Sequence, residues 1–219
     1  MPSKYSIKEY IGKSYYHVFN RGVEKRVIFQ DDLDRRVFLN YLKVALSPEL
    51  EDDTKAEVLS SLTAARLRRL NLYRDIELQA FCLIPNHFHL LLYQKTEHAI
   101  RDLMRSIMTG YVMYFNRRYQ RVGGLFQGRY KASRIDNQAY LWHISRYIHL
   151  NPLDLGEDFA SYAYSSFPYF IGEKQAEWVR PKRLLAVYKE HKQNYEQFVN
   201  DYIGYKQTLD EIKHELADS

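Results

Sequence analysis

Residues 76–94 read IELQAFCLIPNHFHLLLYQ, and this stretch decides the fold class. Two apolar runs of strand length, 76–84 and 87–94, are separated only by Pro85 and Asn86. Pro and Asn favour tight turns, and a tight turn between two such runs is typical of a β-hairpin. The sequence therefore predicts two antiparallel strands joined at Pro85-Asn86.

The segments around this hairpin predict further strands and helices. Residues 14–20 (SYYHVFN) are aromatic and β-branched, which favours a strand, and the basic segment 125–135 (LFQGRYKASRI) is also expected to be extended. Apolar residues at helical spacing predict three long helices, at 31–46, 97–119 and about 137–150. The remaining predictions for this region are a polar loop at 48–56, a short helix at 57–71 and an aromatic loop at 153–172.

This order of elements is typical of an α+β fold in which helices cover one face of an antiparallel sheet. Beyond Gly172, an amphipathic and highly charged helical tail is predicted from about Pro181 to Glu215, with a candidate break at Gly204. We therefore divide the chain into a domain over residues 1–172 and a C-terminal helical extension over 173–219.

The composition is that of a globular protein with a mild positive charge. Of 219 residues, 46% are hydrophobic, and 32 basic against 27 acidic side chains give a net charge of +5. This charge permits a phosphate-rich partner without requiring one. The one cysteine, Cys82, excludes an internal disulfide and a cysteine-built metal site. The N-terminus lacks a signal peptide and no apolar stretch approaches the roughly 18 residues of a membrane span, so a cytoplasmic protein is expected.

His87 and His89 follow the predicted turn directly. Because side chains alternate along a strand, the two histidines project to one side and Phe88 projects to the opposite core. Two neutral imidazoles at this spacing can chelate one divalent cation, although ordinary histidines beside a turn are the alternative. A metallo-β-lactamase-type site is disfavoured, because residues 90–92 (LLL) follow where that site continues with Asp and His.

Tyr147 and Asn151 lie one turn apart at the end of the helix predicted to reach Leu150, so they share a face. A tyrosine phenolate could attack a phosphodiester, and the amide oxygen beside it could complete a set of metal ligands. The alternative is a packed tyrosine and an asparagine that merely precedes Pro152. His149 projects ~160° away from both, so it is interpreted as structural or DNA-facing rather than as a ligand.

One short stretch combines cations with aromatic residues, among them Tyr119, Phe126 and Tyr130. Such a combination suits a single DNA strand, because cations neutralise phosphates while aromatic rings stack on bases. A solvated charged surface is the alternative. The basic residues of this stretch are Arg117, Arg118, Arg121, Arg129, Lys131 and Arg134.

Together these segments resemble the transposases that have one catalytic tyrosine and a His-hydrophobic-His (HUH) motif, and among them those associated with repetitive extragenic palindromes (REPs). The resemblance covers about residues 14–172, roughly three quarters of the chain. The matching stretches, in family order, are YHVFNRG (16–22), the IF-x-DD-x-D segment (28–34), LIPNHFHLLL (83–92), GLFQGRYK (124–131), RYIHLNP (146–152) and YAYSSFPYFIG (162–172).

The resemblance implies a ferredoxin-like α/β sandwich with the histidines on a central strand and the tyrosine on a helix. It implies that His87, His89 and Asn151 bind Mg²⁺ or Mn²⁺. Tyr147 would then attack single-stranded, hairpin-forming DNA, leaving a 5′-phosphotyrosine and a free 3′-OH. A monomer and a homodimer both stay open, and no membrane partner is expected.

Arg21 and Arg146 join the predicted DNA-binding residues. Either the metal or a cation such as Arg146 is expected to make the phenolate accessible. Two departures from the family pattern bear on target recognition. NPLDLG (151–156) replaces the more usual NP-hydrophobic-Arg-Ala-Gly, and Tyr164 stands where many relatives have Trp.

Two other classes of protein stay open. A ferredoxin-like module could bind structured nucleic acid without chemistry, but it would not need the His-His-Tyr-Asn set. A metal-dependent phosphoesterase that uses water would keep the histidines but would not need Tyr147.

Overall fold

The computed structural model describes residues 10–48, 70–189 and 194–203. Within these residues, one antiparallel sheet has the strand order β2-β3-β1-β4. The strands are β1 (Ser14–Arg21), β2 (Ile76–Ile84), β3 (His87–Gln94) and β4 (Lys131–Ile135). With α1 between β1 and β2 and α4 between β3 and β4, this is the ferredoxin-like arrangement that was expected.

The predicted hairpin is confirmed, and it forms the part of the sheet that contains the histidines. β2 and β3 pair antiparallel up to Ile84 and His87, on either side of the Pro85-Asn86 turn. β3 is a central strand, because its other edge pairs with β1. The extended segment predicted at 125–135 is a strand only from Lys131, since Gly128 adopts a positive φ of 75° that interrupts the extended chain.

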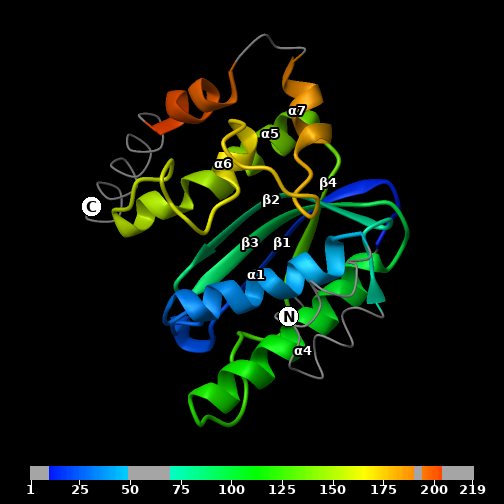
Figure 1. Ribbon diagram of the computed structural model, residues 1–219. Coiled ribbons are helices and arrows are strands. Elements are labelled where there is room, and N and C mark those ends of the chain that lie inside the picture. Colours follow the sequence, from blue (N-terminus) through cyan, green and yellow to red (C-terminus); the bar gives the residue numbers. More distant parts are fainter. Residues whose placement is uncertain (1–9, 49–69, 190–193, 204–219) are drawn as a thin grey trace, which may run out of the picture.

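Helices α1 (Asp32–Leu46) and α4 (Ala99–Arg118) pack on one face of the sheet (Figure 1). The side chain of Asp31 caps α1 by accepting a hydrogen bond from the backbone N–H of Asp34. The first residues of the predicted second helix are not helical, because His98 has a left-handed backbone. The core of this layer combines strand and helix side chains, all 0% exposed: Val18, Phe38, Leu42, Phe88, Leu90, Leu92, Leu103 and Tyr111.

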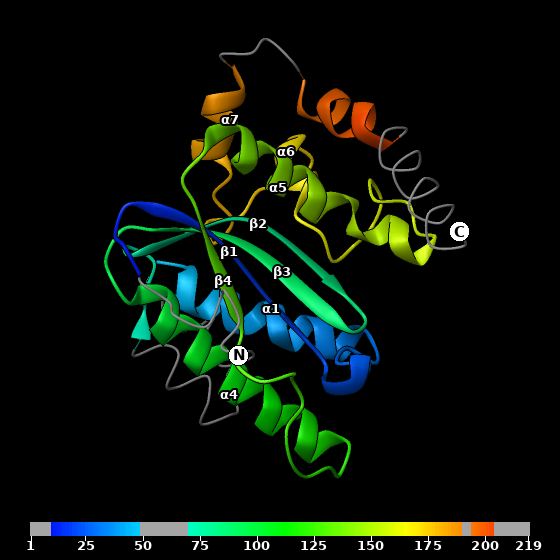
Figure 2. The same ribbon diagram turned by 180° about the vertical axis from the view of Figure 1, so that it is seen from behind.

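The opposite face of the sheet is covered by α5 (Gln138–Leu150), α6 (Phe167–Phe170) and α7 (Lys182–Lys189), as Figure 2 shows from behind. The expectation of helices on one face only was therefore wrong. The physical reason is that both faces of β2 are apolar: Ala80, Cys82 and Ile84 join Leu91 of β3 in a second buried cluster that must be removed from water.

The C-terminal part of the chain packs against this second cluster. Leu184 of α7, with Tyr195 and Val199 of the helical residues 195–203, is buried in it beside residues of α5. The helical tail is thus confirmed for these stretches. The boundary at residue 172 stays a prediction, and the break at Gly204, the loop at 49–56 and residues 57–69 lie outside the described residues.

No helix within the described residues is long and apolar enough to span a membrane. The loop predicted at 153–172 is partly helical, because it contains α6 and the end of the 3-10 helix η3 (Asn151–Leu155).

Candidate active site

Strand alternation places His87 and His89 on the face of β3 that α5 covers. Phe88 and Leu90 point into the opposite core and are 0% exposed, as the sequence predicted. His89 is buried, while His87, next to the turn, is half-buried. The ring centroids of the two histidines are 4.9 Å apart and the rings are nearly perpendicular. The two imidazoles can therefore act on one small group.

The end of α5 brings Tyr147 and Asn151 to the histidines. Asn137 begins the helix by capping the N–H of Tyr140, and Pro152 follows its last turn. Asn151 is buried, and its Nδ2 donates to the carbonyl oxygen of Tyr147, 2.7 Å away. This bond fixes the orientation of the Asn151 amide against the last turn of α5. It also directs Oδ1 of Asn151 away from the helix, toward β3.

Tyr147 is the exposed member of the site, with 40% of its surface accessible. Its ring meets the ring of His89 edge to face, with centroids 5.3 Å apart. The sequence prediction that these residues share one site matches this geometry, although they come from segments that are 58 residues apart.

Two acceptor atoms face each other between β3 and α5. Nδ1 of His87 donates to Oδ1 of Asn86 at 2.7 Å, because an amide oxygen can only accept. A neutral His87 therefore has a lone pair on Nε2, and this atom lies 3.4 Å from Oδ1 of Asn151. Neither atom carries a hydrogen, so the pair is stable only when a cation or a donor is shared between them.

A third acceptor completes the arrangement. Nε2 of His89 is buried and has no hydrogen-bond partner in the described part of the chain. Two imidazole nitrogens and an amide oxygen suit a divalent cation and leave positions for a phosphate. No cluster of three or more His, Cys, Asp or Glu side chains is placed to hold a metal among the described residues, and the third polar group beside the two histidines is an amide.

Burial keeps the histidines neutral. It lowers the pKa of His87, against a smaller opposing effect of Oδ1 of Asn151, which would accept a hydrogen from the protonated ring. It also lowers the pKa of His89 well below its ordinary value, and the neighbouring histidines add to this shift. Neutral imidazoles are the form that binds metals.

Burial also raises the pKa of Tyr147, and the negative charge of Asp154 adds to the effect. The phenolate therefore needs a nearby positive charge. Arg146 does not supply it, which corrects the prediction for this residue. It is buried, contacts Nδ1 of His143 at 2.7 Å and lies over the rings of Phe198 and Tyr202, on the side of α5 away from the sheet.

His17 is the site residue that sequence reasoning missed. It lies on β1, is 6% exposed, and its Nε2 is 2.8 Å from Nδ1 of His89. Alternation along SYYHVFN could have placed His17 on one face with Phe19. The pairing of β1 with β3, which brings that face to His89, was not readable from the sequence.

His149 is structural, which was one of its two interpretations. It is 0% exposed and hydrogen-bonds to the hydroxyl groups of Tyr195 and Ser166. Ser166 in turn accepts from the backbone N–H of Phe81 on β2. These bonds tie the C-terminal end of α5 to the sheet and to the helical residues 195–203.

The structure divides the predicted DNA-binding residues among different surfaces. Arg21 is paired with His87 across β1 and β3, and its Nε is buried with no hydrogen-bond partner among the described residues. The exposed Lys131 lies 5.7 Å above the ring of Phe19, which itself contacts His89. Arg129 is exposed just before β4. Arg21 and Lys131 therefore border the candidate site.

The other cations lie elsewhere. Arg134 is paired in register with Tyr16, whose side chain is in the α1–α4 core, so it lies on the opposite face, near Asp136. Arg118 forms ion pairs of 2.6 Å with Asp31 and with the buried Asp34. At the end of α4, Arg117 is exposed and Arg121 lies over the ring of Phe115.

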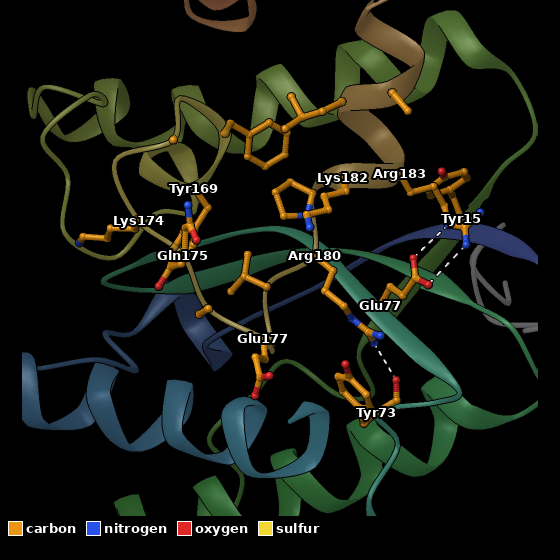
Figure 3. A pocket seen from close by; sticks show the side chains of 17 residues that line it. Tyr15, Tyr73, Glu77, Tyr169, Lys174, Gln175, Glu177, Arg180, Lys182 and Arg183 are labelled. Carbon is orange, nitrogen blue, oxygen red and sulfur yellow. Dashed lines mark hydrogen bonds and ion pairs between the residues drawn. The ribbon is translucent and has the colours of Figure 1, made fainter. Parts of the chain in front are cut away.

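A cavity of about 1320 Å³ lies at the edge of β2, beside α7 (Figure 3). Its polar lining includes Glu77, Arg180 and Arg183, and none of the candidate catalytic residues borders it. Arg183 is paired with Glu77, and Arg180 donates to the carbonyl oxygen of Tyr73. This cavity is therefore separate from the tyrosine–histidine site.

Comparisons with known proteins identify the family. No curated protein matches the chain. A solved structure of a REP-associated tyrosine transposase bound to a REP hairpin is 15% identical, with a TM-score of 0.48 over 80% of this chain and 90% of that chain. The sequence profile described as "Transposase IS200 like" matches residues 10–151, well over half of the chain, ending on Asn151. The protein therefore belongs to the IS200-like transposase family.

Proposed function

We propose that this protein cuts and rejoins single-stranded DNA through a covalent bond to Tyr147, at a site where His87, His89 and Asn151 hold a divalent cation. The observation that carries the proposal is the pair of facing acceptors, Nε2 of His87 and Oδ1 of Asn151, 3.4 Å apart. The orphaned Nε2 of His89 adds a third lone pair. Because the ring of Tyr147 lies against His89, nucleophile and ligands share one site.

The fixed side chains of the site would do most of the positioning. Asn86 and the carbonyl oxygen of Tyr147 orient His87 and Asn151, so that both acceptors are directed inward before any ligand binds. When bound there, Mg²⁺ or Mn²⁺ would supply positive charge that polarises the scissile phosphate and stabilises the phenolate. Arg21, beside His87, would add a second positive charge toward the phosphate.

The cleavage step exchanges one phosphate ester for another. The phenolic oxygen of Tyr147 forms a bond to phosphorus, its proton passes to solvent, and the bond from phosphorus to the 3′ oxygen breaks. That oxygen takes a proton and leaves as a free 3′-OH, while the 5′-phosphate stays on the tyrosine. A later attack by a 3′-OH on this linkage reseals DNA and restores the tyrosine, so no nucleotide cofactor is needed.

Hairpin-forming single-stranded DNA is the substrate we propose, on the resemblance to REP-associated transposases. Lys131 and Arg129 would contact phosphates beside the site, and the half-buried ring of Phe19 could stack on a base. Three of the predicted cations are not part of this surface. Arg118 is held in ion pairs with Asp31 and Asp34, and Arg134 lies on the opposite face of the sheet. Arg146 packs against Tyr202 of the helical residues 195–203.

One experiment separates this proposal from the alternatives. End-labelled hairpin DNA with a single-stranded flank is incubated with the protein and Mg²⁺ or Mn²⁺, and the products are run on a denaturing gel. A strand that migrates with the protein supports the proposal. Cleavage without an adduct indicates a phosphoesterase, and binding without cleavage indicates a binding module.

Replacement of Tyr147 by Phe tests the nucleophile. Tyr147→Phe should bring the covalent adduct below detection, because the ring is kept and only the attacking oxygen is lost, and it should cost less than about 1 kcal/mol of stability. Tyr140→Phe is the matched control, since Tyr140 lies on the same helix and is 46% exposed. Full adduct formation by Tyr147→Phe would overturn the assignment.

A further inference from the structure

The bond between His17 and His89 joins two buried imidazoles on neighbouring strands. Nε2 of His17 and Nδ1 of His89 are 2.8 Å apart, and their residues are 4–6% exposed. The ring planes differ by 19° and the centroids are 5.0 Å apart. With the two nitrogens so close and the centroids so far apart, the rings lie edge to edge, as an in-line N–H···N bond requires.

Only one of the two nitrogens in this bond can carry the hydrogen. When His89 carries it on Nδ1, its Nε2 has a lone pair, and His17 must accept at Nε2 and carry its own hydrogen on Nδ1. When His17 donates instead, a neutral His89 has its hydrogen on Nε2. In that case the buried Nε2–H of His89 has no acceptor within the described residues.

We infer that His17 is a positioning residue that holds His89 in the Nδ1–H form, with Nε2 ready to bind the cation. This inference rests on the proposed function, since it concerns the same cation. His87 has its hydrogen held by Asn86, an ordinary amide acceptor. His89 has an imidazole in that role, whose orientation depends on the pairing of β1 with β3.

The consequence is that the affinity for the cation depends on a residue that does not touch it. Loss of an outer hydrogen-bond partner of a metal-binding histidine typically weakens metal binding by about 10- to 100-fold. His17→Leu removes the acceptor and keeps a side chain of similar size. His17→Gln restores an acceptor, because an amide oxygen can replace the imidazole nitrogen.

The test measures metal binding on the full chain without DNA. Titration with Mn²⁺, followed by the electron paramagnetic resonance signal of the free ion, should give about 10- to 100-fold weaker binding for His17→Leu and recovery toward the wild-type value for His17→Gln. Val18→Ala is the matched control, since Val18 is the next strand residue, 0% exposed, on the other face. It should lower stability without changing the affinity for Mn²⁺.

A second measurement uses the unmodified protein and does not depend on how the variants fold. Long-range ¹H–¹⁵N spectra of the metal-free chain should show the hydrogen of His89 on Nδ1. A hydrogen on Nε2, or a folded His17→Leu that binds Mn²⁺ as tightly as the wild type, would overturn the role of His17. A wild-type protein that binds no Mn²⁺ would instead contradict the metal part of the proposed function, and the spectra would still decide the state of His89.

Discussion

Each candidate ligand has one polar atom held by a neighbour and one left available. Asn86 holds Nδ1 of His87, His17 contacts Nδ1 of His89, and the carbonyl oxygen of Tyr147 holds the Nδ2 of Asn151. Of the atoms that remain, Nε2 of His87 and Oδ1 of Asn151 lie 3.4 Å apart, and Nε2 of His89 is buried with no hydrogen-bond partner among the described residues. A cation site is thus defined as much by these neighbours as by the ligands themselves.

Replacement of the ligands should separate catalysis from binding. His87→Ala and His89→Ala should each reduce metal-dependent cleavage by at least about 100-fold, because the polarising charge is lost from the phosphate. Asn151→Ala should cost about 10-fold, since water can replace one oxygen ligand. DNA affinity measured in chelator should stay near the wild-type value. Cleavage that proceeds unchanged in chelator would contradict the metal reading for all three residues.

At the scale of elements, α5 is held between the sheet and the C-terminal helix. His149 joins it to both, through Ser166 and Tyr195, and Arg146 packs under Phe198 and Tyr202. Tyr147 lies between these two residues in the chain but faces the sheet. The packing of the residues in the helical stretch 195–203 therefore helps to set where Tyr147 lies relative to the histidines.

α7 is attached to β2 by charged groups that predict a pH dependence (Figure 3). Burial alone would raise the pKa of Glu77, but hydrogen bonds from Arg183 and Lys95, both 2.9 Å away, lower it from 4.5 to about 2. A carboxylate with a lowered pKa stabilises the fold above its unfolded pKa, and this contribution disappears as the pH falls through the folded pKa.

Glu77→Gln should therefore destabilise the protein by about 1–2 kcal/mol at pH 7, and by progressively less toward about pH 3. This free energy is smaller than the pKa shift alone would give, because solvent screens the partly exposed Arg183 and Lys95. Urea unfolding across this range measures the effect. Glu173→Gln, which changes an exposed carboxylate, is the control. A penalty for Glu77→Gln that is the same at every pH would mean that the ion pairs contribute no net stability.

At the scale of the whole molecule, basic side chains of the described residues lie on both faces of the sheet, and only some of them border the candidate site. Lys131 and Arg134 lie three residues apart on one strand but on opposite faces, as their register partners Phe19 and Tyr16 show. Basic residues that are close together in the sequence therefore do not form one basic surface, because the side chains of a strand alternate between the two faces of the sheet.

Binding of single-stranded DNA as a function of salt tests this division. The slope of log K against log salt is negative, and each lost phosphate contact reduces its magnitude by about 0.7 for single strands. Lys131→Gln should therefore bind more weakly and show a slope that is less steep by about 0.7, while Arg134→Gln should match the wild type. Equal effects of the two substitutions would indicate that DNA contacts both faces or follows the edge of β4.

The sequence by itself was sufficient to predict the strands and the main helices. It also predicted that His87 and His89 share one face of a strand and that Tyr147 and Asn151 lie one helical turn apart. These features follow from local rules, namely the two-residue alternation of a strand, the turn at Pro85-Asn86 and the helical repeat. That the two histidines lie beside Tyr147 and Asn151 was expected from the family resemblance, because local periodicity cannot predict contacts between distant segments.

Only the tertiary structure decided the partners across the chain. His17 reaches His89 over 72 residues, and Arg118 reaches Asp34 over 84. Arg146 meets Phe198 over 52 residues, so it turns away from the tyrosine it was expected to assist. Local periodicity says which face a side chain is on, but which other segment covers that face depends on strand order and packing, because these contacts form only when distant parts of the chain come together.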